Sequence, residues 1–167
     1  MGEIRLVKQG SQPMLDVFGP RIEFLTPPTD SASWCILKGV IPAGGFVPLH
    51  SHPDAEGFLV LSGTVQALVE SGGELRRLDV DAGDFLEIPG GVKHAFLNRS
   101  AEPVVQLITT TAKLGRFFGE IARPVGDAPP TPPGPEDVGR FVQIAARYGY
   151  WLGSPEENGR VGIPLLG

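Results

Sequence analysis

The feature that most constrains the fold is a short run of metal-binding side chains between two glycines. His50, His52 and Glu56 all lie within residues 44–63. In an extended strand, residues two apart project to the same face, so the imidazoles of His50 and His52 can meet at one point. A short turn over residues 53–55 would return the Glu56 carboxylate to that point. Two imidazoles and a carboxylate are a set that binds a divalent transition metal, so we expect the chain to fold around a shared site.

A second segment, residues 83–98, repeats this chemistry and contributes His94. The chain has three histidines, and all of them lie in these two segments. Both segments resemble the paired motifs of the cupin superfamily, with no motif position missing. The matching residues are Gly44, His50, His52, Glu56 and Gly63 in the first segment and Gly83, Pro89, Gly91, His94 and Asn98 in the second. We interpret Asn98 as a structural residue that satisfies backbone groups.

This resemblance implies a mainly β protein with a double-stranded β-helix (jelly-roll, cupin) barrel. We place the barrel at residues 1–112 and a Pro-rich, helical C-terminal tail at 113–167, packed on the barrel or on a partner subunit. The resemblance also implies one divalent transition metal ion, which could be Fe, Mn, Ni, Co, Cu or Zn. Its ligands would be His50, His52, Glu56 and His94. Single-domain cupins are commonly homodimers, so we expect a homodimer.

The pattern of apolar residues supports the β assignment independently. Strand-like runs are expected at 4–7, 22–25, 34–41, 58–61, 65–69, 75–80, 85–88, 95–97 and 104–111. Residues 62–64, with Gly63 at their centre, predict a tight hairpin between two of these runs. Many short strands with Gly-rich turns and no intervening helices are typical of an antiparallel sandwich or barrel.

The tail has a different character. A short helix is expected at 114–121, and residues 123–135 then hold six prolines, which favour an extended connector. Pro135 suits the start of a second helix, Gly149 its C-cap, and residues 154–157 form a capping box for a third. The second helix carries an apolar stripe that should be buried, consisting of Val138, Phe141, Val142, Ala145 and Tyr148. All four proposed ligands precede residue 95, so we expect the metal site to persist without the tail.

Composition excludes several function classes. A chain of 167 residues suits one domain, and its net charge of -5 argues against nucleic acid or an anionic membrane as a partner. Cys35 is the single cysteine, so no internal disulfide can form, and a reducing compartment fits. No apolar run approaches the length of a membrane span. We therefore expect a cytoplasmic protein with a small-molecule substrate.

The strand pattern also predicts the lining of the site. Phe58 and Val60 share the parity of Glu56, and Phe96 shares that of His94, so all three should face the interior. Such a lining favours an aromatic or hydrophobic substrate, although any barrel needs an apolar core. One of Arg76 and Arg77 should face inward and could pair with an acidic or phenolate group. Tyr148, Tyr150 and Trp151 are candidates for covering the mouth of the site.

The tail segment at residues 148–158 resembles bacterial single-domain cupins that are similar to quercetin dioxygenase. That resemblance implies a metal-dependent dioxygenase acting on a small aromatic or enolic substrate, with Glu56 as the catalytic base. Two alternatives stay open. The first is a metal-dependent cyclase or isomerase, in which the ion polarises a carbonyl. The second is a non-catalytic module that binds a small molecule. The sequence leaves the metal and the substrate undecided.

Overall fold

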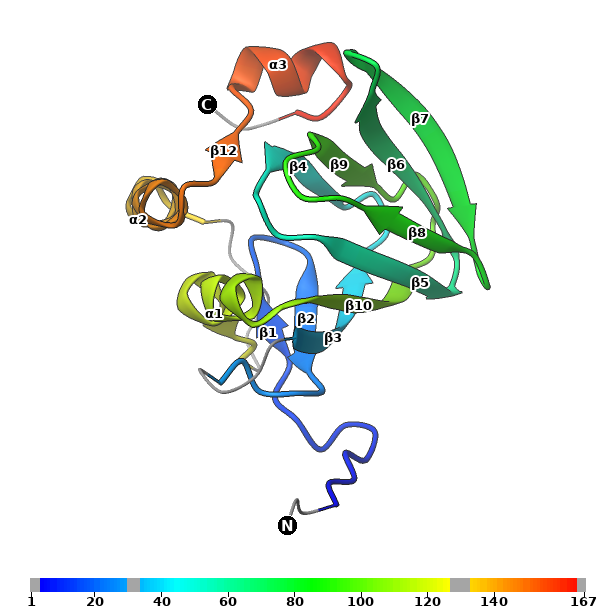
Figure 1. Cartoon of the computed structure of the whole chain (residues 1–167), viewed down its shortest axis with the longest axis vertical. Helices are drawn as coiled ribbons and strands as arrows, with labels where there is room; N and C mark the ends of the chain where they lie inside the picture. Colours follow the sequence, from blue (N-terminus) through cyan, green and yellow to red (C-terminus); the bar gives the residue numbers. More distant parts are fainter. Residues whose placement is uncertain (1–3, 30–33, 127–132, 165–167) are drawn as a thin grey trace.

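A computed structural model describes residues 4–29, 34–126 and 133–164 and shows two antiparallel sheets with helices beside them (Figure 1). The seven-stranded sheet contains, in spatial order, β11 (Arg123–Pro124), β1 (Leu15–Asp16), β2 (Arg21–Phe24), β3 (Trp34–Ile41), β10 (Val104–Thr111), β5 (Glu56–Ser62) and β8 (Phe85–Ile88). The five-stranded sheet contains β12 (Trp151–Leu152), β4 (Phe46–Ser51), β9 (His94–Leu97), β6 (Thr64–Ser71) and β7 (Glu74–Asp81). The predicted mainly β jelly roll is confirmed, in the form of two sheets rather than one continuous closed barrel.

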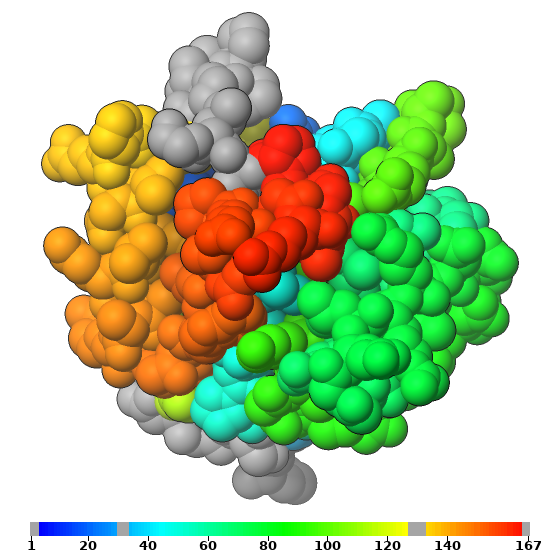
Figure 2. Space-filling view, turned by 90° about the horizontal axis from the view of Figure 1, so that it is seen from above, coloured from blue at the N-terminus to red at the C-terminus, as the bar shows by residue number. Residues whose placement is uncertain are grey.

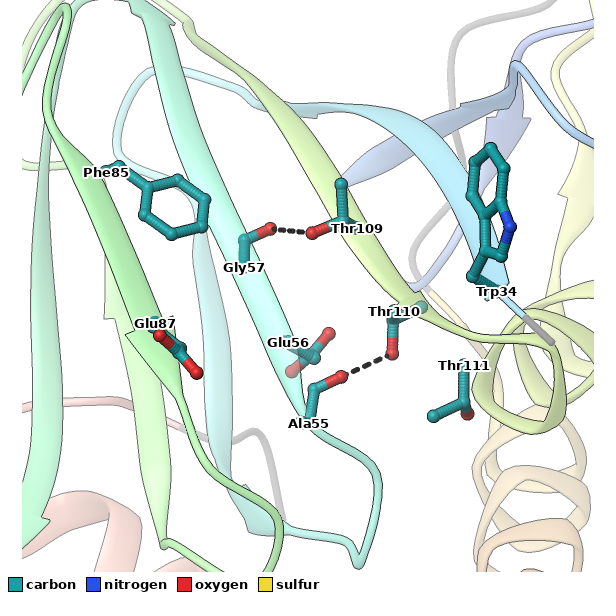
Figure 3. Close-up of a pocket in the computed structure, with 9 residues that line it drawn as sticks. All are labelled: Trp34, Ala55, Glu56, Gly57, Phe85, Glu87, Thr109, Thr110 and Thr111. Atoms are coloured by element: carbon teal, nitrogen blue, oxygen red, sulfur yellow. Dashed lines mark hydrogen bonds between the residues drawn. The ribbon is translucent and has the colours of Figure 1, made fainter.

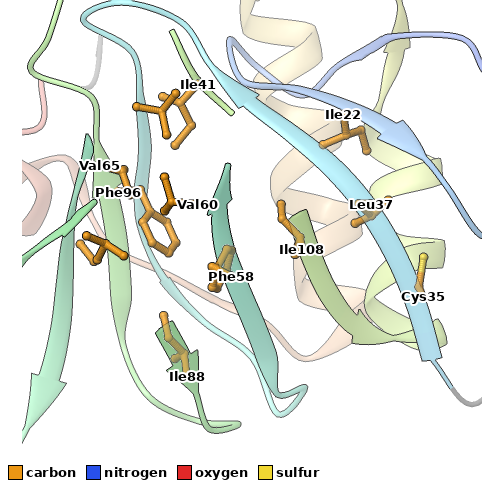
Figure 4. Close-up of a cluster of buried hydrophobic side chains, with 13 residues drawn as sticks. Ile22, Cys35, Leu37, Ile41, Phe58, Val60, Val65, Ile88, Phe96 and Ile108 are labelled. Atoms are coloured by element: carbon orange, nitrogen blue, oxygen red, sulfur yellow. The ribbon is translucent and has the colours of Figure 1, made fainter. Parts of the chain in front are cut away.

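The space between the sheets is filled by apolar side chains (Figure 4). Alternation along the strands produces this core, because every second residue of β3 and β10 is buried. Phe58 of β5 and Phe96 of β9 meet across the core with ring centroids 4.7 Å apart. Burying a side chain of this size stabilises the fold by roughly 1.5–3 kcal/mol before conformational entropy is subtracted.

An irregularity in β4 decides which of its side chains face the core. Val47 is paired with Phe96, whereas His50 is paired with His94, so β4 carries one more residue than β9 between these two pairs. This bulge lies beside Pro48, which has no N–H to donate to the ladder. Because the bulge shifts the alternation by one residue, Val47 and His50 both face the interior.

The turns correct the one predicted hairpin. β6 and β7 pair along their whole length through the turn at Gly72 and Gly73. β5 and β6 do not pair: β5 lies between β10 and β8 in one sheet, and β6 between β9 and β7 in the other. The hairpin predicted at Gly63 is therefore wrong. With φ at 81°, Gly63 instead turns the chain from one sheet to the other.

The predicted strand at residues 4–7 is also wrong. These residues have no regular secondary structure, and Ile4 is fully exposed. Arg5 reaches the domain through Nη1, which donates a hydrogen bond of 2.7 Å to the Leu25 carbonyl. Alternating residues form a strand only where a neighbouring strand can pair with them, and none of the described strands pairs with this segment.

Three helices lie after β10 in the described part of the chain: α1 (Ala112–Ile121), α2 (Pro135–Tyr148) and α3 (Pro155–Arg160). α1 starts directly after β10, where Thr111 Oγ1 accepts a hydrogen bond from the Leu114 N–H. Gly149 ends α2 in the left-handed conformation, as predicted. The expected capping box of Ser154 and Glu157 opens α3. None of the described helices is long and apolar enough to cross a membrane.

α2 buries a face that differs in part from the predicted stripe. Ile144 and Ala145 are buried against α1, whereas Val138 and Val142 are 44% and 48% exposed. The buried face follows the i, i+3, i+4, i+7 spacing that starts at Phe141, and the two valines lie outside it. Figure 2 shows the C-terminal part of the chain, in orange and red, lying beside the strands of the same molecule.

Candidate metal centre

The four predicted ligands meet at one end of the space between the sheets. His50 lies near the end of β4, His52 lies in the turn that follows, and His94 is the first residue of β9. Glu56 is the first residue of β5, so its carboxylate comes from the opposite sheet. One ligand atom from each residue lies within 4.8 Å of those of the others. Three of the four side chains are buried, and His50 is partly exposed.

The hydrogen bonds of the imidazoles fix their tautomers. Nδ1 of His50 lies 2.7 Å from the Pro48 carbonyl. Nδ1 of His52 lies 2.9 Å from the carbonyl of Asp54, and Nδ1 of His94 lies 2.8 Å from that of Val92. A carbonyl oxygen can only accept, so each Nδ1 must carry the hydrogen. In the neutral rings every Nε2 therefore keeps its lone pair for a ligand, as in established metal sites.

These lone pairs face the carboxylate of Glu56. Its Oε2 lies 3.1 Å from Nε2 of His52 and 3.2 Å from Nε2 of His94. The contact with His52 is poorly aligned for a hydrogen bond, so this buried Nε2 has no well-directed partner among the described residues. A buried group of acceptors repels itself unless a cation lies between them. The residues therefore fit a divalent transition metal ion, and a proton can replace it only in part.

The electrostatics of the cluster follow from this crowding. Burial and the adjacent imidazole of His94 lower the pKa of His50 to about 3. Burial alone would raise the pKa of Glu56, but its contacts with His52 and His94 outweigh burial and lower it to about 2. Burial alone would lower the pKa of His52, yet contact with Glu56 and its charge raise that pKa overall. Glu56 is thus a carboxylate, and His52 holds a proton more tightly than His50 does.

The two motifs are joined by a close backbone contact. The Gly91 N–H donates a hydrogen bond of 2.7 Å to the carbonyl of His52. At Gly90 an added Cβ would lie 2.1 Å from the carbonyl oxygen of Pro53, nearer than any real contact allows. The turn of the second motif therefore needs glycine so that it can lie against the ligand segment of the first.

Asn98 is a structural residue, as the sequence indicated. Its Nδ2 donates hydrogen bonds to the carbonyls of Ile41, Pro42 and Glu102, at distances of 2.7–3.0 Å. The residue is almost completely buried and lies at the end of β9 away from His94. Its contacts tie together two loops and leave the metal centre untouched.

The sequence reasoning missed Asp54, which lies in the gap between His52 and Glu56. Its carboxylate accepts a hydrogen bond of 2.7 Å from the Tyr150 hydroxyl and a second one from Thr111. Tyr150 was expected near the mouth of the site, and its ring lies 5.3 Å from that of His52. No local signal links it to Asp54, because the two residues are 96 positions apart.

The site borders the apolar core between the two sheets. Phe58, Val60 and Phe96 face the interior as predicted. Arg76 and Arg77 are both exposed, so the inward arginine predicted for β7 is wrong. β7 is an edge strand and buries only Val80.

A pocket of about 360 Å³ opens on the seven-stranded sheet (Figure 3). Its lining includes Trp34, Phe85 and Thr109, which are exposed, and Gly57, which β10 and β8 flank. Successive residues of a strand point to opposite faces, so these side chains lie on the far side of the sheet from the Glu56 carboxylate. The lining also includes Glu56, one of the four proposed ligands, so the pocket adjoins the metal centre at this residue.

The fold and the site together indicate the class of protein, which is a two-sheet jelly roll with three imidazoles and one carboxylate converging at one end. Residues 38–110 match the family model Cupin_2, described as a cupin domain, and this range contains all four proposed ligands. The protein thus has the cupin fold. No curated protein matches the chain at a significant level.

Solved structures agree on the fold. The polyketide cyclase RemF from Streptomyces resistomycificus is 17% identical with a TM-score of 0.57, over 66% of this chain and 80% of that chain. A variant of oxalate decarboxylase from Bacillus subtilis is 18% identical with a TM-score of 0.56, over 66% of this chain and 30% of that one. An uncharacterized double-stranded β-helix protein from Klebsiella pneumoniae is 17% identical with a TM-score of 0.53, over 66% of this chain and 91% of that chain.

Proposed function

We propose that this protein is a metal-dependent oxygenase that acts on a small aromatic or enolic substrate. The observation that carries the proposal is the convergence of three imidazole Nε2 atoms and one carboxylate at the end of an apolar interior. His50, His52, Glu56 and His94 would hold the ion. Four protein ligands leave open positions on an ion that takes six, as substrate binding requires.

A bound divalent ion would supply Lewis acidity and a direct binding position for a substrate oxygen. Glu56 is ionised, because its pKa is lowered to about 2, and can accept the proton of a substrate hydroxyl. His50 is the partly exposed ligand, so substrate would approach from its side. Phe58 and Phe96 supply an apolar wall, and the carbonyls of Pro48, Asp54 and Val92 keep the imidazoles oriented.

The test is oxygen consumption by metal-loaded protein with a panel of flavonols and catechols. Glu56→Gln should reduce turnover by roughly 100-fold or more per bound metal if the carboxylate accepts the substrate proton. Glu87→Gln is the matched control, because Glu87 lies on the neighbouring strand, is exposed and is not one of the four proposed ligands. Equal turnover per metal in Glu56→Gln and Glu87→Gln would restrict Glu56 to coordination.

A second candidate is a metal-dependent cyclase or isomerase, which the structural similarity to the polyketide cyclase RemF favours. In this case Glu56 would move a proton on the substrate without net oxidation. Turnover under anaerobic conditions would identify this activity, and oxygen uptake matched to product would identify the first. Tight ligand binding without any turnover would identify a binding module. The homodimer and the cytoplasmic location stay predictions.

A further inference from the structure

Asp54 connects a metal ligand to the C-terminal part of the chain. Its main-chain carbonyl accepts the hydrogen bond from Nδ1 of His52 at 2.9 Å. Its carboxylate accepts hydrogen bonds from the hydroxyls of Tyr150 and Thr111, one on each oxygen. The Asp54 residue is 6% exposed, so its carboxylate oxygens depend on these donors rather than on water for hydrogen bonds.

Tyr150 is held by contacts with the helices α1 and α2. Its ring contacts that of Phe117 of α1, with centroids 4.8 Å apart, and Nζ of Lys113 lies 5.2 Å from its centre. Its N–H donates a hydrogen bond of 2.9 Å to the carbonyl of Ala145, in the last turn of α2. The phenol is thus fixed at both ends, by the helix pair and by Asp54.

The residues that follow Tyr150 continue toward the site as β12. Trp151 is paired with Ser51 and Leu152 with His50, so the tail forms a strand beside the one that carries the ligand. The Gly153 N–H then donates a hydrogen bond of 2.7 Å to the Leu49 carbonyl. Residues far beyond the two motifs therefore contact the first motif directly.

We propose that Tyr150 is a positioning residue of the metal centre: its hydroxyl fixes Asp54, whose carbonyl fixes the ring of His52. The inference rests on the metal centre of the proposed function but not on the reaction. Without the hydroxyl, the buried Asp54 carboxylate loses one of its two donors, so the residue must turn to find another partner. This turn moves the carbonyl that orients His52 and therefore weakens metal binding.

Co(II) binding, followed by its visible absorption and by competition with a chelator, tests this. Tyr150→Phe keeps the ring and removes only the hydroxyl. Partners of metal ligands typically contribute 10–100-fold to affinity, so we expect about 10-fold weaker Co(II) binding and an altered absorption spectrum. Tyr148→Phe is the matched control, because the Tyr148 hydroxyl donates a hydrogen bond of 2.6 Å to Glu120 in the same aromatic cluster, away from the ligands.

A second comparison shows whether Tyr150 acts through Asp54. In an Asp54→Ala background, Tyr150→Phe should have no further effect on Co(II) affinity, since the contact is already lost. This experiment also keeps the proposal testable if Tyr150→Phe lowers stability. The single variant Asp54→Ala and the double variant both lack the hydrogen bond between Tyr150 and Asp54, so they can be compared directly. A full additional loss of affinity in that background would overturn the proposed route.

The outcomes separate the two proposals. Unchanged Co(II) affinity in Tyr150→Phe would overturn the positioning role and leave the metal centre in place. An equal loss in Tyr150→Phe and Tyr148→Phe would reduce the effect to general packing and would also overturn it. Wild-type protein that binds no Co(II), and behaves like His94→Ala, would overturn the metal centre and the positioning role together.

Discussion

The two segments that supply the histidines are supported in different ways. β9, which begins with His94, lies between β4 and β6 and is buried throughout. β4, which carries His50, has β9 on one side and only the short strand β12 on the other. His94 is therefore positioned by the sheet itself, whereas His50 and His52 depend on the C-terminal part of the chain. A complete motif in the sequence is not a self-sufficient site.

Asn158 of α3 shows how far this dependence goes. Its Oδ1 accepts a hydrogen bond of 2.8 Å from the Leu49 N–H, next to His50. Its Nδ2 donates to the carbonyls of Gly153 and Ser154. The residue is completely buried and takes the place of a strand neighbour for β4. This argues against our expectation that the metal site persists without the tail.

The largest effect should come from the ligands, whichever segment supplies them. His94→Ala and His50→Ala should each weaken Co(II) binding by more than about 100-fold, beyond the range typical for residues that only support a ligand. Elemental analysis of the purified variants measures this. Stoichiometric metal in either variant would show that the residue is not a ligand, and the comparison of the two segments would lose its basis.

The next largest effect should come from the turn of the second segment, which packs against the first segment. Gly90→Ala should destabilise the protein by about 3 kcal/mol or more, because its methyl group would collide with the Pro53 backbone. Gly91→Ala meets no atom but requires φ at 86°, and should cost about 1 kcal/mol. Urea unfolding of both variants measures the difference. A smaller loss for Gly90→Ala than for Gly91→Ala would contradict the close approach.

Two buried asparagines offer a matched pair. Asn158→Ala and Asn98→Ala each leave buried backbone groups unpaired, so each should lower the free energy of unfolding by about 1–3 kcal/mol. Only Asn158→Ala should also weaken Co(II) binding, because Asn98 holds loops away from the ligands. Equal Co(II) affinities in these two variants would mean that β4 keeps its place without α3.

The smallest effect expected is the pH dependence of the metal-free protein. The folded pKa of His50, about 3, lies below its ordinary value, so stability from this group is lost as the pH falls from about 6.5 toward 3. The pKa of Glu56, about 2, is also lowered, so the stability that this group contributes is lost as the pH falls below 4.5. The pKa of His52 is raised, so the stability that His52 contributes is largest at low pH and partly offsets these two losses. Urea unfolding should show a net loss on acidification that His50→Ala reduces. A flat or rising profile would contradict the crowding of the imidazoles.

Much of the fold could be predicted from local patterns. The limits of β3, β8 and β10 follow from alternation between apolar and other residues, and the end of α2 from Gly149. These features depend on the intrinsic period of a strand and on positive φ, which neighbouring residues encode. Residues 4–7 carry the same alternation but lack a pairing partner, and local sequence does not contain that information.

For the site, sequence patterns were enough to show which side chains could bind a metal and that they lie in two glycine-bounded motifs. How these side chains meet depends on three features of the tertiary structure: the bulge that turns His50 toward His94, the crossing between β4 and β5 that places Glu56 in the other sheet, and the hydrogen bond from Tyr150 to Asp54. The reason is that strand register and buried hydrogen bonds depend on segments that are distant in the chain. Spacing within a motif fixes side-chain direction only up to the next bulge, and the support of the first motif comes from residues about 100 positions later.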